Sequence, residues 1–510
     1  MSRRAAGFAA LPLLGATVLG AVVLAAVVLA AVVLALGAAP ATAQAAAAAT
    51  AAGGAPPAPR TVVTFTWGGG LADQMGALPI FEQDRMHATF YVPSGYVCEA
   101  ATDPGCAHSP YLTLPDIRQI AAAGNEIGGL SVGHLPLTGF PGAEAQREIC
   151  DDRVNLTRWG FRVTDFAYPF AEASRTLETL AQRCGYNSGL GTGQLRGAGL
   201  CPRCPWAETI PPQNPYLLRA PIEVSSVGTN WTAATFEQIV TGAQNHGGGW
   251  IIFTVHDVCA QACALGVTRA ELSTVLAWLS QQARHGVSVQ TVRQVVGGPV
   301  RPAVPGPRPP RIRPPGVANS RLALVTAGGV PACFQTARYG TNQATFQYLG
   351  RGGPAGAGAE LVSVTGRTSG TAQLLPALDL GECAPTVSPG RSYTLGAWYK
   401  SSQPVTFNVY SRTSVGTWKF WVSSPLMAAA PGWTQVKWTP PAVPSGVTAI
   451  SFGVALRSNG TVTTSRYSLV PVRYSSTRLI ALSVGVAALV VVPVATRRLR
   501  RRGRPGSSPR

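Results

Sequence analysis

A proline-rich segment divides this 510-residue chain into separate folding units. Between Gly297 and Gly316 the prolines are Pro299, Pro302, Pro305, Pro307, Pro309, Pro310, Pro314 and Pro315. Proline fixes φ and removes a backbone donor, so this density supports neither helix nor sheet and favours extended polyproline geometry. A single core also rarely grows beyond roughly 250 to 300 residues. We therefore expect residues 297–319 to form a semi-rigid linker between two folded parts.

Before this linker, residues 61–296 alternate short apolar runs with helical patterns. The runs expected as buried strands are Val62–Trp67, Ala88–Val92, Glu126–Leu130, Asp165–Tyr168, Trp250–Val255 and Val287–Gln290. The helices expected between them are Leu114–Ala123, Glu144–Trp159, Ser174–Cys184, Ala233–Asn245 and Arg269–His285. Strands that alternate with helices form parallel sheets. The pattern predicts an α/β domain, a deformed (β/α) barrel that is closed or partly closed.

After the linker, residues 320–473 alternate apolar and polar positions, with Gly or Pro turns and no helical period. The clearest strands are Ser392–Lys400, Val405–Arg412, Trp418–Ser423, Trp433–Trp438 and Ala449–Leu456. This pattern predicts an antiparallel β-sandwich. Aromatic residues in these strands could stack on sugar rings, although alternation implies that about half of them fill the core. They are Trp398, Tyr399, Trp418, Phe420, Trp421, Trp433 and Trp438.

Both ends of the chain are apolar segments flanked by arginines. Residues 1–45 carry Arg3 and Arg4, a long Ala, Val and Leu run and a small-residue end, which predicts a signal peptide or an uncleaved N-terminal apolar anchor. A low-complexity linker follows at residues 46–60. Residues 478–496 contain an uncharged apolar run before a basic tail at residues 497–510, which predicts a transmembrane helix with a cytoplasmic tail. We expect a single C-terminal anchor in the cell membrane and the bulk of the chain outside.

Ten cysteines fit an oxidising compartment. The pairs expected first are Cys98 with Cys106, Cys150 with Cys184, Cys201 with Cys204, Cys259 with Cys263, and Cys333 with Cys383. Alternatively, Cys201 and Cys204 could bind zinc together with Cys259 and Cys263. An oxidising environment favours disulfides over such a site.

The formal net charge of +19 does not predict a nucleic-acid partner. Seven arginines stand in the tail and others in the proline-rich stretch, a distribution that indicates membrane topology instead of a binding face. Neither a helix-turn-helix pattern nor an aromatic and basic RNA platform is present. We expect no nucleic acid, and a membrane contact through the C-terminal helix.

Four segments of residues 61–296 carry motifs in a characteristic order. They are VVTFTWGGGLADQ at 62–74 with ATFYV at 88–92, GNEIGGLSVGH at 124–134, FAYPF at 166–170, and WIIFTVHD at 250–257. In order and spacing this set resembles the motifs of secreted polysaccharide deacetylases, the NodB-homology family, over about half the chain. The resemblance implies a metal-dependent hydrolase of carbon–nitrogen bonds that removes acetyl groups from polysaccharides.

The family chemistry depends on five side chains, two aspartates and three histidines. The first motif of the family ends with two adjacent aspartates, of which one is the general base and the other binds the metal. Its second motif supplies two histidines four residues apart to the same metal, and a histidine in the last motif protonates the leaving amine. Zinc held in this way polarises the acetyl carbonyl and acidifies the attacking water.

This sequence departs from the family at those positions. The two aspartates fall on Gly68 and Gly69, and the first metal histidine falls on Leu130, so His134 is the one matching ligand. His256 matches the family's last-motif histidine and is the candidate catalytic residue. Glycine and leucine cannot ligate, and a catalytic zinc uses three protein ligands. We expect no metal cofactor, and zinc or another divalent metal only if the protein is active.

Further positions of the third motif also differ, because the family's arginine and closing glycine correspond to Ala167 and Ala171. Tyr168, Pro169 and Phe170 are candidate substrate-binding residues. His134 and His256 could instead be structural imidazoles at strand ends.

Four acids are conceivable replacements for the missing carboxylates. Asp73 lies beyond the turn that presents the family's catalytic pair, and Glu126 lies in an expected strand. Asp151 and Asp152 fall within a helical pattern that favours a solvated face for both.

Three hypotheses result. The first is a membrane-anchored extracellular deacetylase-like protein that has lost hydrolysis and binds cell-wall or extracellular polysaccharide. The second is an active deacetylase of cell-wall or chitin-like glycans with a relocated metal site or a metal-free mechanism. The third is a structural or partner-binding surface protein.

Overall fold

The computed structural model describes residues 60–99, 109–197, 199–221, 231–261, 263–312 and 316–473. The expected N-terminal segment, low-complexity linker, C-terminal span and basic tail therefore lie outside the described residues, apart from Arg60. Within the described ranges, none of the helices combines the length and apolar character needed to cross a membrane.

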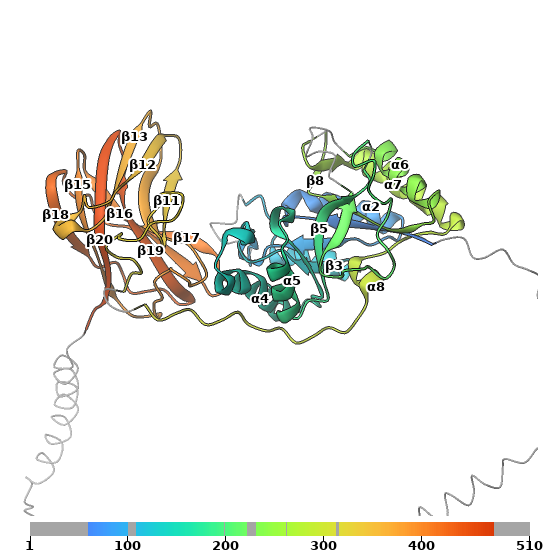
Figure 1. Cartoon of the computed structure of the whole chain (residues 1–510), viewed down its shortest axis with the longest axis horizontal. Helices are drawn as coiled ribbons and strands as arrows, with labels where there is room; N and C mark the ends of the chain where they lie inside the picture. Colours follow the sequence, from blue (N-terminus) through green and yellow to red (C-terminus); the bar gives the residue numbers. More distant parts are fainter. Residues whose placement is uncertain are drawn as a thin grey trace, which may run out of the picture. The chain divides into compact units, whose positions relative to one another are not determined.

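The first domain is a parallel β-sheet flanked by helices, as the alternating pattern predicts (Figure 1). Its strands are β1 (Thr61–Trp67), β2 (Thr89–Val92), β3 (Glu126–Gly129), β4 (Asp165–Ala167), β5 (Ser188–Leu195), β6 (Leu218–Pro221), β7 (Gly249–Val255) and β10 (Val287–Val289). All seven residues of β1 are buried. This strand pairs with β7 along its length on one side, and with β10 and then β2 on the other.

The helices of this domain cover the sheet and begin at recognisable caps. They are α2 (Leu78–Gln83), α3 (Leu114–Ala122), α4 (Gly142–Arg158), α5 (Arg175–Arg183), α6 (Ala233–Gln244), α7 (Arg269–Gln282) and α8 (Val292–Val296). Five of them follow a Ser or Thr whose hydroxyl accepts a backbone N–H of the first turn, which satisfies a donor that the helix leaves unpaired. These caps are Thr113, Ser174, Thr232, Thr268 and Thr291.

Glu208 connects β6 to β7, which closes the curved sheet. Its backbone N–H and C=O exchange two 2.8 Å hydrogen bonds with Trp250 of β7. Its buried carboxylate accepts two bonds from the guanidinium of Arg219 on β6, at 2.6 and 2.8 Å. A single residue between the two strands therefore replaces a continuous ladder, in agreement with the predicted partly closed barrel.

The proline-rich linker has no helix or strand over residues 297–312, as predicted, and its carbonyls accept side-chain donors from the first domain. Arg153 of α4 donates to the carbonyls of Arg301 and Pro302 at 2.6 and 2.9 Å. Asn187 donates to the carbonyls of Gly297 and Pro299. The extended chain offers these carbonyls because it makes no backbone ladder of its own.

The prediction of a solvated face is wrong for Asp152, whereas Asp151 is half-buried. Asp152 is 0% exposed and accepts the backbone N–H groups of Ser94 and Leu130 at 2.9 and 3.0 Å. Asp151 accepts the N–H of Gly306 in the linker at 2.8 Å. Buried carboxylates need such partners, and here the partners come from loops that helical periodicity alone cannot reveal.

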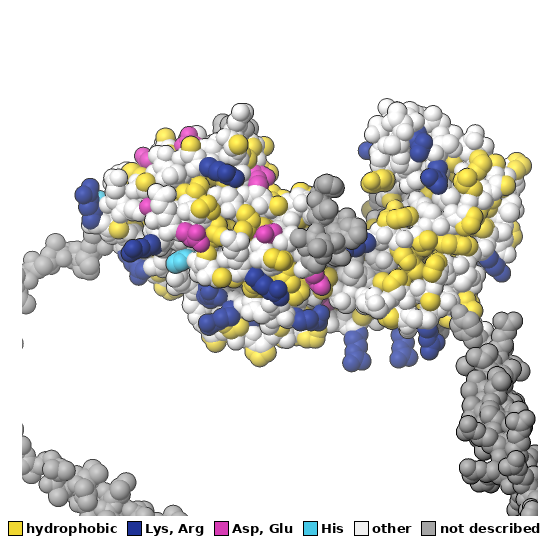
Figure 2. All heavy atoms as spheres, turned by 180° about the vertical axis from the view of Figure 1, so that it is seen from behind, with side chains coloured by type: hydrophobic (Ala, Val, Ile, Leu, Met, Phe, Trp, Pro, Cys, Tyr) yellow, Lys and Arg dark blue, Asp and Glu magenta, His cyan; other side chains and the backbone are white. Residues whose placement is uncertain are grey.

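The C-terminal domain is an antiparallel β-sandwich, as predicted. One sheet has the order β11 (Phe334–Tyr339), β14 (Thr371–Pro376), β19 (Val447–Leu456), β16 (Val405–Thr413) and β17 (Trp418–Ser423). The other has the order β12 (Gln343–Leu349), β13 (Ala359–Thr365), β20 (Gly460–Pro471), β15 (Tyr393–Ser401) and β18 (Ala430–Trp438). Hydrophobic side chains form a band across the outside of the C-terminal domain in Figure 2. Fewer of the predicted aromatic residues fill the core than expected, since Tyr399 alone of the seven is buried, five tryptophans are half-buried and Phe420 is 57% exposed.

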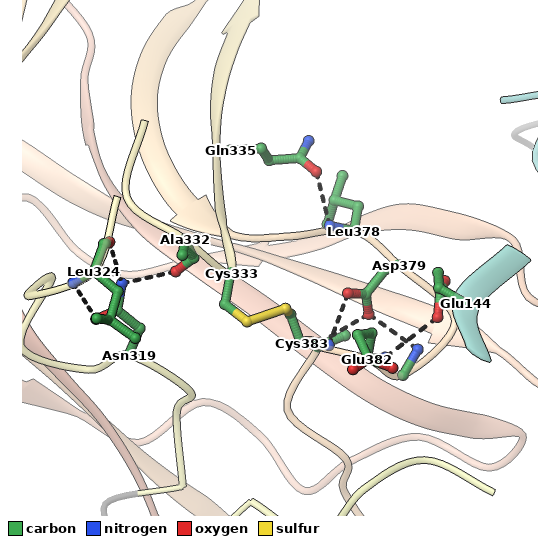
Figure 3. Close-up of a disulfide and its surroundings, with 12 residues drawn as sticks. Glu144, Asn319, Leu324, Ala332, Cys333, Gln335, Leu378, Asp379, Glu382 and Cys383 are labelled. Atoms are coloured by element: carbon green, nitrogen blue, oxygen red, sulfur yellow. Dashed lines mark hydrogen bonds between the residues drawn. A yellow bond between two sulfur atoms is a disulfide. The ribbon is translucent and has the colours of Figure 1, made fainter. Parts of the chain in front are cut away.

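Four of the five predicted cysteine pairs are disulfides, and the fifth involves Cys106, outside the described residues. The four are Cys150–Cys184, Cys201–Cys204, Cys259–Cys263 and Cys333–Cys383. The disulfide Cys333–Cys383 anchors the loop after β14 (Figure 3). In this loop the Asp379 carboxylate accepts the N–H of Cys383, and Glu144 of α4 accepts the N–H of Leu380.

Candidate functional site

The four motif segments meet around one pocket of about 320 Å³ at the end of β1. The motif residues that line it are Gly68, Leu130, His134, Ala167, Tyr168, Phe170, Ala171, Thr254 and His256. Tyr91, Leu190, Thr192 and Leu265 complete the wall. The structure therefore brings together most of the residues that the motifs single out, although Gly69 and Pro169 do not line the pocket.

His256 lies directly against Gly68. A Cβ atom placed on Gly68 would lie 3.1 Å from Nε2 and 3.3 Å from Cδ2 of the His256 ring. The Gly68 N–H donates to the Val255 carbonyl at 2.9 Å. The buried amide of Gln74 donates to the carbonyls of both Gly68 and His256, at 2.7 and 2.8 Å. A side chain at position 68 would therefore lie in tight contact with this imidazole.

His134 ends a tight loop after β3. Its own φ is +49°, and its backbone N–H donates to the Ser131 hydroxyl at 3.0 Å. The neighbouring Gly133 N–H donates to the Glu148 carboxyl of α4 at 2.7 Å. The His134 ring lies against the Phe170 ring with centroids 4.8 Å apart. A buried carboxyl group and a hydroxyl therefore fix the backbone that presents this imidazole.

Both imidazoles favour the neutral form. Burial lowers the pKa of His134, and the nearby His256 lowers it further. Burial alone lowers the pKa of His256. Removing an imidazolium from water is unfavourable when no carboxylate compensates, and no carboxylate lines this pocket in the described part of the chain. The site is polar but uncharged.

The third motif shapes one wall of the pocket. The Tyr168 hydroxyl donates to the Tyr216 carbonyl at 2.8 Å, and its ring passes over Gly189, where any Cβ would lie 2.6 Å from that oxygen. Phe170 has a φ of +56° and is 61% exposed. The strained backbone directs an apolar ring to the pocket mouth, where it can contact a ligand.

The conceivable replacement acids do not line the pocket. Asp73 accepts the Val258 N–H at 3.2 Å, and burial followed by the charge of Asp257 raises its pKa. Glu126 accepts the Thr89 hydroxyl at 2.9 Å and the Arg293 N–H at 2.8 Å. Both carboxyl groups serve the framework around the site.

Two hydroxyl groups of the pocket wall were not predicted from the sequence. Tyr91 and Thr254 are buried, and their hydroxyl oxygens have no hydrogen-bond partner among the described residues. Buried polar groups without partners are rare and need an explanation, such as a ligand that supplies the bond. Both residues lie within motif segments, but at positions in apolar strands that look like ordinary core positions, so the motifs do not single out these hydroxyl groups.

The donor set does not fit a catalytic metal. Catalytic zinc takes three protein ligands, whereas this pocket offers two imidazoles with glycine and leucine at the remaining family positions. Among the described residues, no group of three or more His, Cys, Asp or Glu side chains is placed to hold a metal ion.

Residues 55–189 match the family model described as polysaccharide deacetylase. The predicted resemblance to this family is therefore confirmed over these residues, about a quarter of the chain. No curated protein matches the sequence.

Solved structures align with parts of the chain at low identity. The Bc1960 peptidoglycan N-acetylglucosamine deacetylase aligns over 48% of this chain and 92% of its own, with 16% identity and a TM-score of 0.32. A family 4 carbohydrate esterase from Streptomyces lividans aligns over 49% and 99%, with 14% identity and a TM-score of 0.30. The enzymatically active domain of tailspike protein 4 from bacteriophage CBA120 aligns over 28% of this chain and 20% of its own, with 13% identity and a TM-score of 0.22. The chain thus spans only a fifth of that last protein.

Proposed function

We propose that the first domain binds polysaccharide in this pocket without hydrolysing it. The observation that carries the proposal is the contact between His256 and Gly68, because glycine at this position leaves the imidazole without the neighbouring carboxylate that the family has there. With leucine at position 130, the pocket keeps two neutral imidazoles and no acid. A metal contributes several kcal/mol of transition-state stabilisation, so its loss without replacement removes nearly all turnover.

The pocket suits an uncharged acetylated sugar. Phe170 presents an apolar ring face at the mouth, of the kind on which a pyranose ring stacks. Tyr91 and Thr254 supply hydroxyl groups that an acetamido group or a sugar hydroxyl can satisfy. A volume of about 320 Å³ lies at the small end of ligand pockets, which fits one sugar unit better than a long segment.

The test combines binding with turnover on the full chain. Tetra-N-acetylchitotetraose should bind, and its deacetylated amine form should bind more weakly, because no carboxylate lines the pocket to pair with ammonium groups. Phe170→Ala should weaken binding about fivefold through the lost stacking. The matched control is Leu426→Ala in the β-sandwich, a similarly exposed apolar side chain that lines neither this pocket nor the cleft of the sandwich and should leave this affinity unchanged.

Acetate release and metal content decide the catalytic question. We expect neither acetate from acetylated chitooligosaccharide or peptidoglycan nor bound zinc at stoichiometric level. Turnover with stoichiometric zinc would refute the non-catalytic proposal. Binding that is absent for every acetylated glycan would refute the proposed ligand class.

We also propose that the protein is anchored in the cell membrane with both domains outside. Support comes from the arginine-flanked apolar segments at the two ends of the sequence, together with the four disulfides. Protease added to intact cells should degrade both domains and spare the basic tail. Protection of the domains would contradict this topology.

A further inference from the structure

The β-sandwich has a cleft of about 500 Å³ of its own, on the outer face of the sheet that contains β11, β14, β16, β17 and β19. Along β16, Phe407 and Val409 point into the core of the sandwich, so Asn408 and Tyr410 lie on the outer face. Thr371, Tyr339 and Phe420 reach the same cleft from β14, β11 and β17.

Two aromatic rings of this cleft are exposed far more than core rings are. Tyr339 on β11 is 76% exposed and Phe420 on β17 is 57% exposed. These strands are the two edges of one sheet. The ring of Tyr410 supports Phe420 edge-on, with centroids 5.8 Å apart. Rigid aromatic faces held apart by a strand framework can stack on successive rings of a polymer.

The floor of the cleft is made of hydrogen-bonding side chains. The Ser423 hydroxyl donates to Asn408 at 2.8 Å, and the Asn408 amide donates weakly to the Thr371 hydroxyl at 3.4 Å. Beneath Tyr410, the amide of Gln373 donates to the phenolic oxygen at 3.3 Å. Gln373 is 1% exposed, and its Oε1 has no partner in the described part of the chain. Such a floor suits a ligand rich in hydroxyl groups.

The charge around the cleft is positive. Arg367 and Arg457 line it, and no acidic side chain does. Residues 320–473 contain twelve Lys and Arg but only three Asp and Glu, a formal charge of +9. Of these three acids, Glu360 and Asp379 are buried and Glu382 pairs with Arg147 at 2.6 Å. Residues 61–296 have fourteen basic and nineteen acidic residues, a formal charge of −5, so the sandwich is the positively charged one of the two folded domains.

We propose that this cleft binds an acidic polysaccharide. Sugar rings stack on Tyr339 and Phe420, while carboxylates of the same polymer pair with Arg367 and Arg457. The disulfide Cys333–Cys383 in this domain fits an oxidising compartment, where glycans are a more suitable partner than nucleic acids. The site is separate from the pocket of the first domain and does not depend on the function proposed for that pocket.

The test measures the affinity of the full chain for three probes. Polygalacturonate presents carboxylates on sugar rings, its methyl ester keeps the rings without the charge, and polyglutamate keeps the charge without the rings. Polygalacturonate should bind best, with both relatives weaker by about tenfold or more. The double variant Arg367→Gln with Arg457→Gln should lose about tenfold for polygalacturonate but little for the ester.

Matched variants distinguish binding in this cleft from non-specific attraction to the positive charge of the domain. Phe420→Ala and Tyr339→Ala should each weaken polygalacturonate binding about fivefold. Arg351→Gln, an exposed arginine outside the cleft, should leave it unchanged. All of these side chains except Arg367 are largely exposed, and unchanged thermal unfolding verifies that each variant folds.

Three results would overturn the proposal. Equal affinity for polyglutamate would remove the role of the rings. An equal loss in Arg351→Gln would reduce the interaction to net charge. Tighter binding of single-stranded DNA or of anionic lipid vesicles than of polygalacturonate would assign the surface to another partner.

Discussion

Glu148 of α4 is the buried carboxyl group whose titration should be measurable in the stability of the first domain. It is 2% exposed, and its Oε2 accepts the Gly133 N–H at 2.7 Å. Burial raises the pKa of Glu148 to about 8 against the opposing effect of that hydrogen bond, and the charges of Glu144 and Asp152 add to the rise. In the folded protein this side chain therefore stays protonated at neutral pH.

The sign of the pH dependence follows from this raised pKa. Between the ordinary value of 4.5 and about 8, the folded state holds a proton that the unfolded state has released. Stability must then fall as pH rises through this window. For one group with these two values, the loss between pH 5 and pH 8 is about 3.5 kcal/mol in the free energy of unfolding.

Glu148→Gln removes the titration while it keeps an oxygen that can accept the Gly133 N–H. The variant should match the wild type near pH 5 and exceed its free energy of unfolding by about 3 kcal/mol at pH 8. Urea unfolding followed by tryptophan fluorescence at the two pH values measures this difference. Glu82→Gln on the exposed side of α2 is the control and should keep the wild-type slope. If Glu148→Gln is destabilised equally at both pH values, the carboxyl is ionised in the fold and the reasoning fails.

Two further predictions concern the framework. Glu208→Gln should lower the free energy of unfolding by about 2 kcal/mol, because it breaks the ion pair with Arg219 that helps to join β6 to β7. Urea unfolding measures this loss, with Glu82→Gln as the control, and an unchanged free energy would show that the backbone bridge alone joins the strands. Replacing both Cys333 and Cys383 by serine should lower the free energy of unfolding by about 4 kcal/mol, because the disulfide closes a loop of 50 residues. Unfolding of the sandwich at the same urea concentration as in the wild type would contradict this prediction.

The strongest strands and helices were predictable because their side chains carry the signal. The predicted strand Val62–Trp67 differs by one residue from the observed β1, and Trp418–Ser423 coincides with β17. By contrast, β5 was missed because its sequence, SGLGTGQL, has little apolar content. Gly189 in this strand is needed for the passage of Tyr168 above it, a tertiary requirement that no local pattern expresses.

The candidate site was predictable only where motifs mark it. The order of the motifs places His134 and His256 in one pocket, as the structure shows. The unpartnered hydroxyls of Tyr91 and Thr254 were missed because a polar atom in a buried strand is recognised only once its neighbours are known. Whether hydrolysis is lost stays a prediction that the acetate assay tests.

The buried acids of α4 explain how the pocket can persist without catalytic side chains. Asp152 accepts the N–H of Leu130, and Glu148 accepts that of Gly133, so both hold backbone groups and neither depends on the side chain presented there. A histidine at position 130 can therefore become leucine without loosening the loop. The proposed loss of hydrolysis is therefore compatible with an unchanged loop, because its backbone hydrogen bonds and the side chain at position 130 involve different atoms.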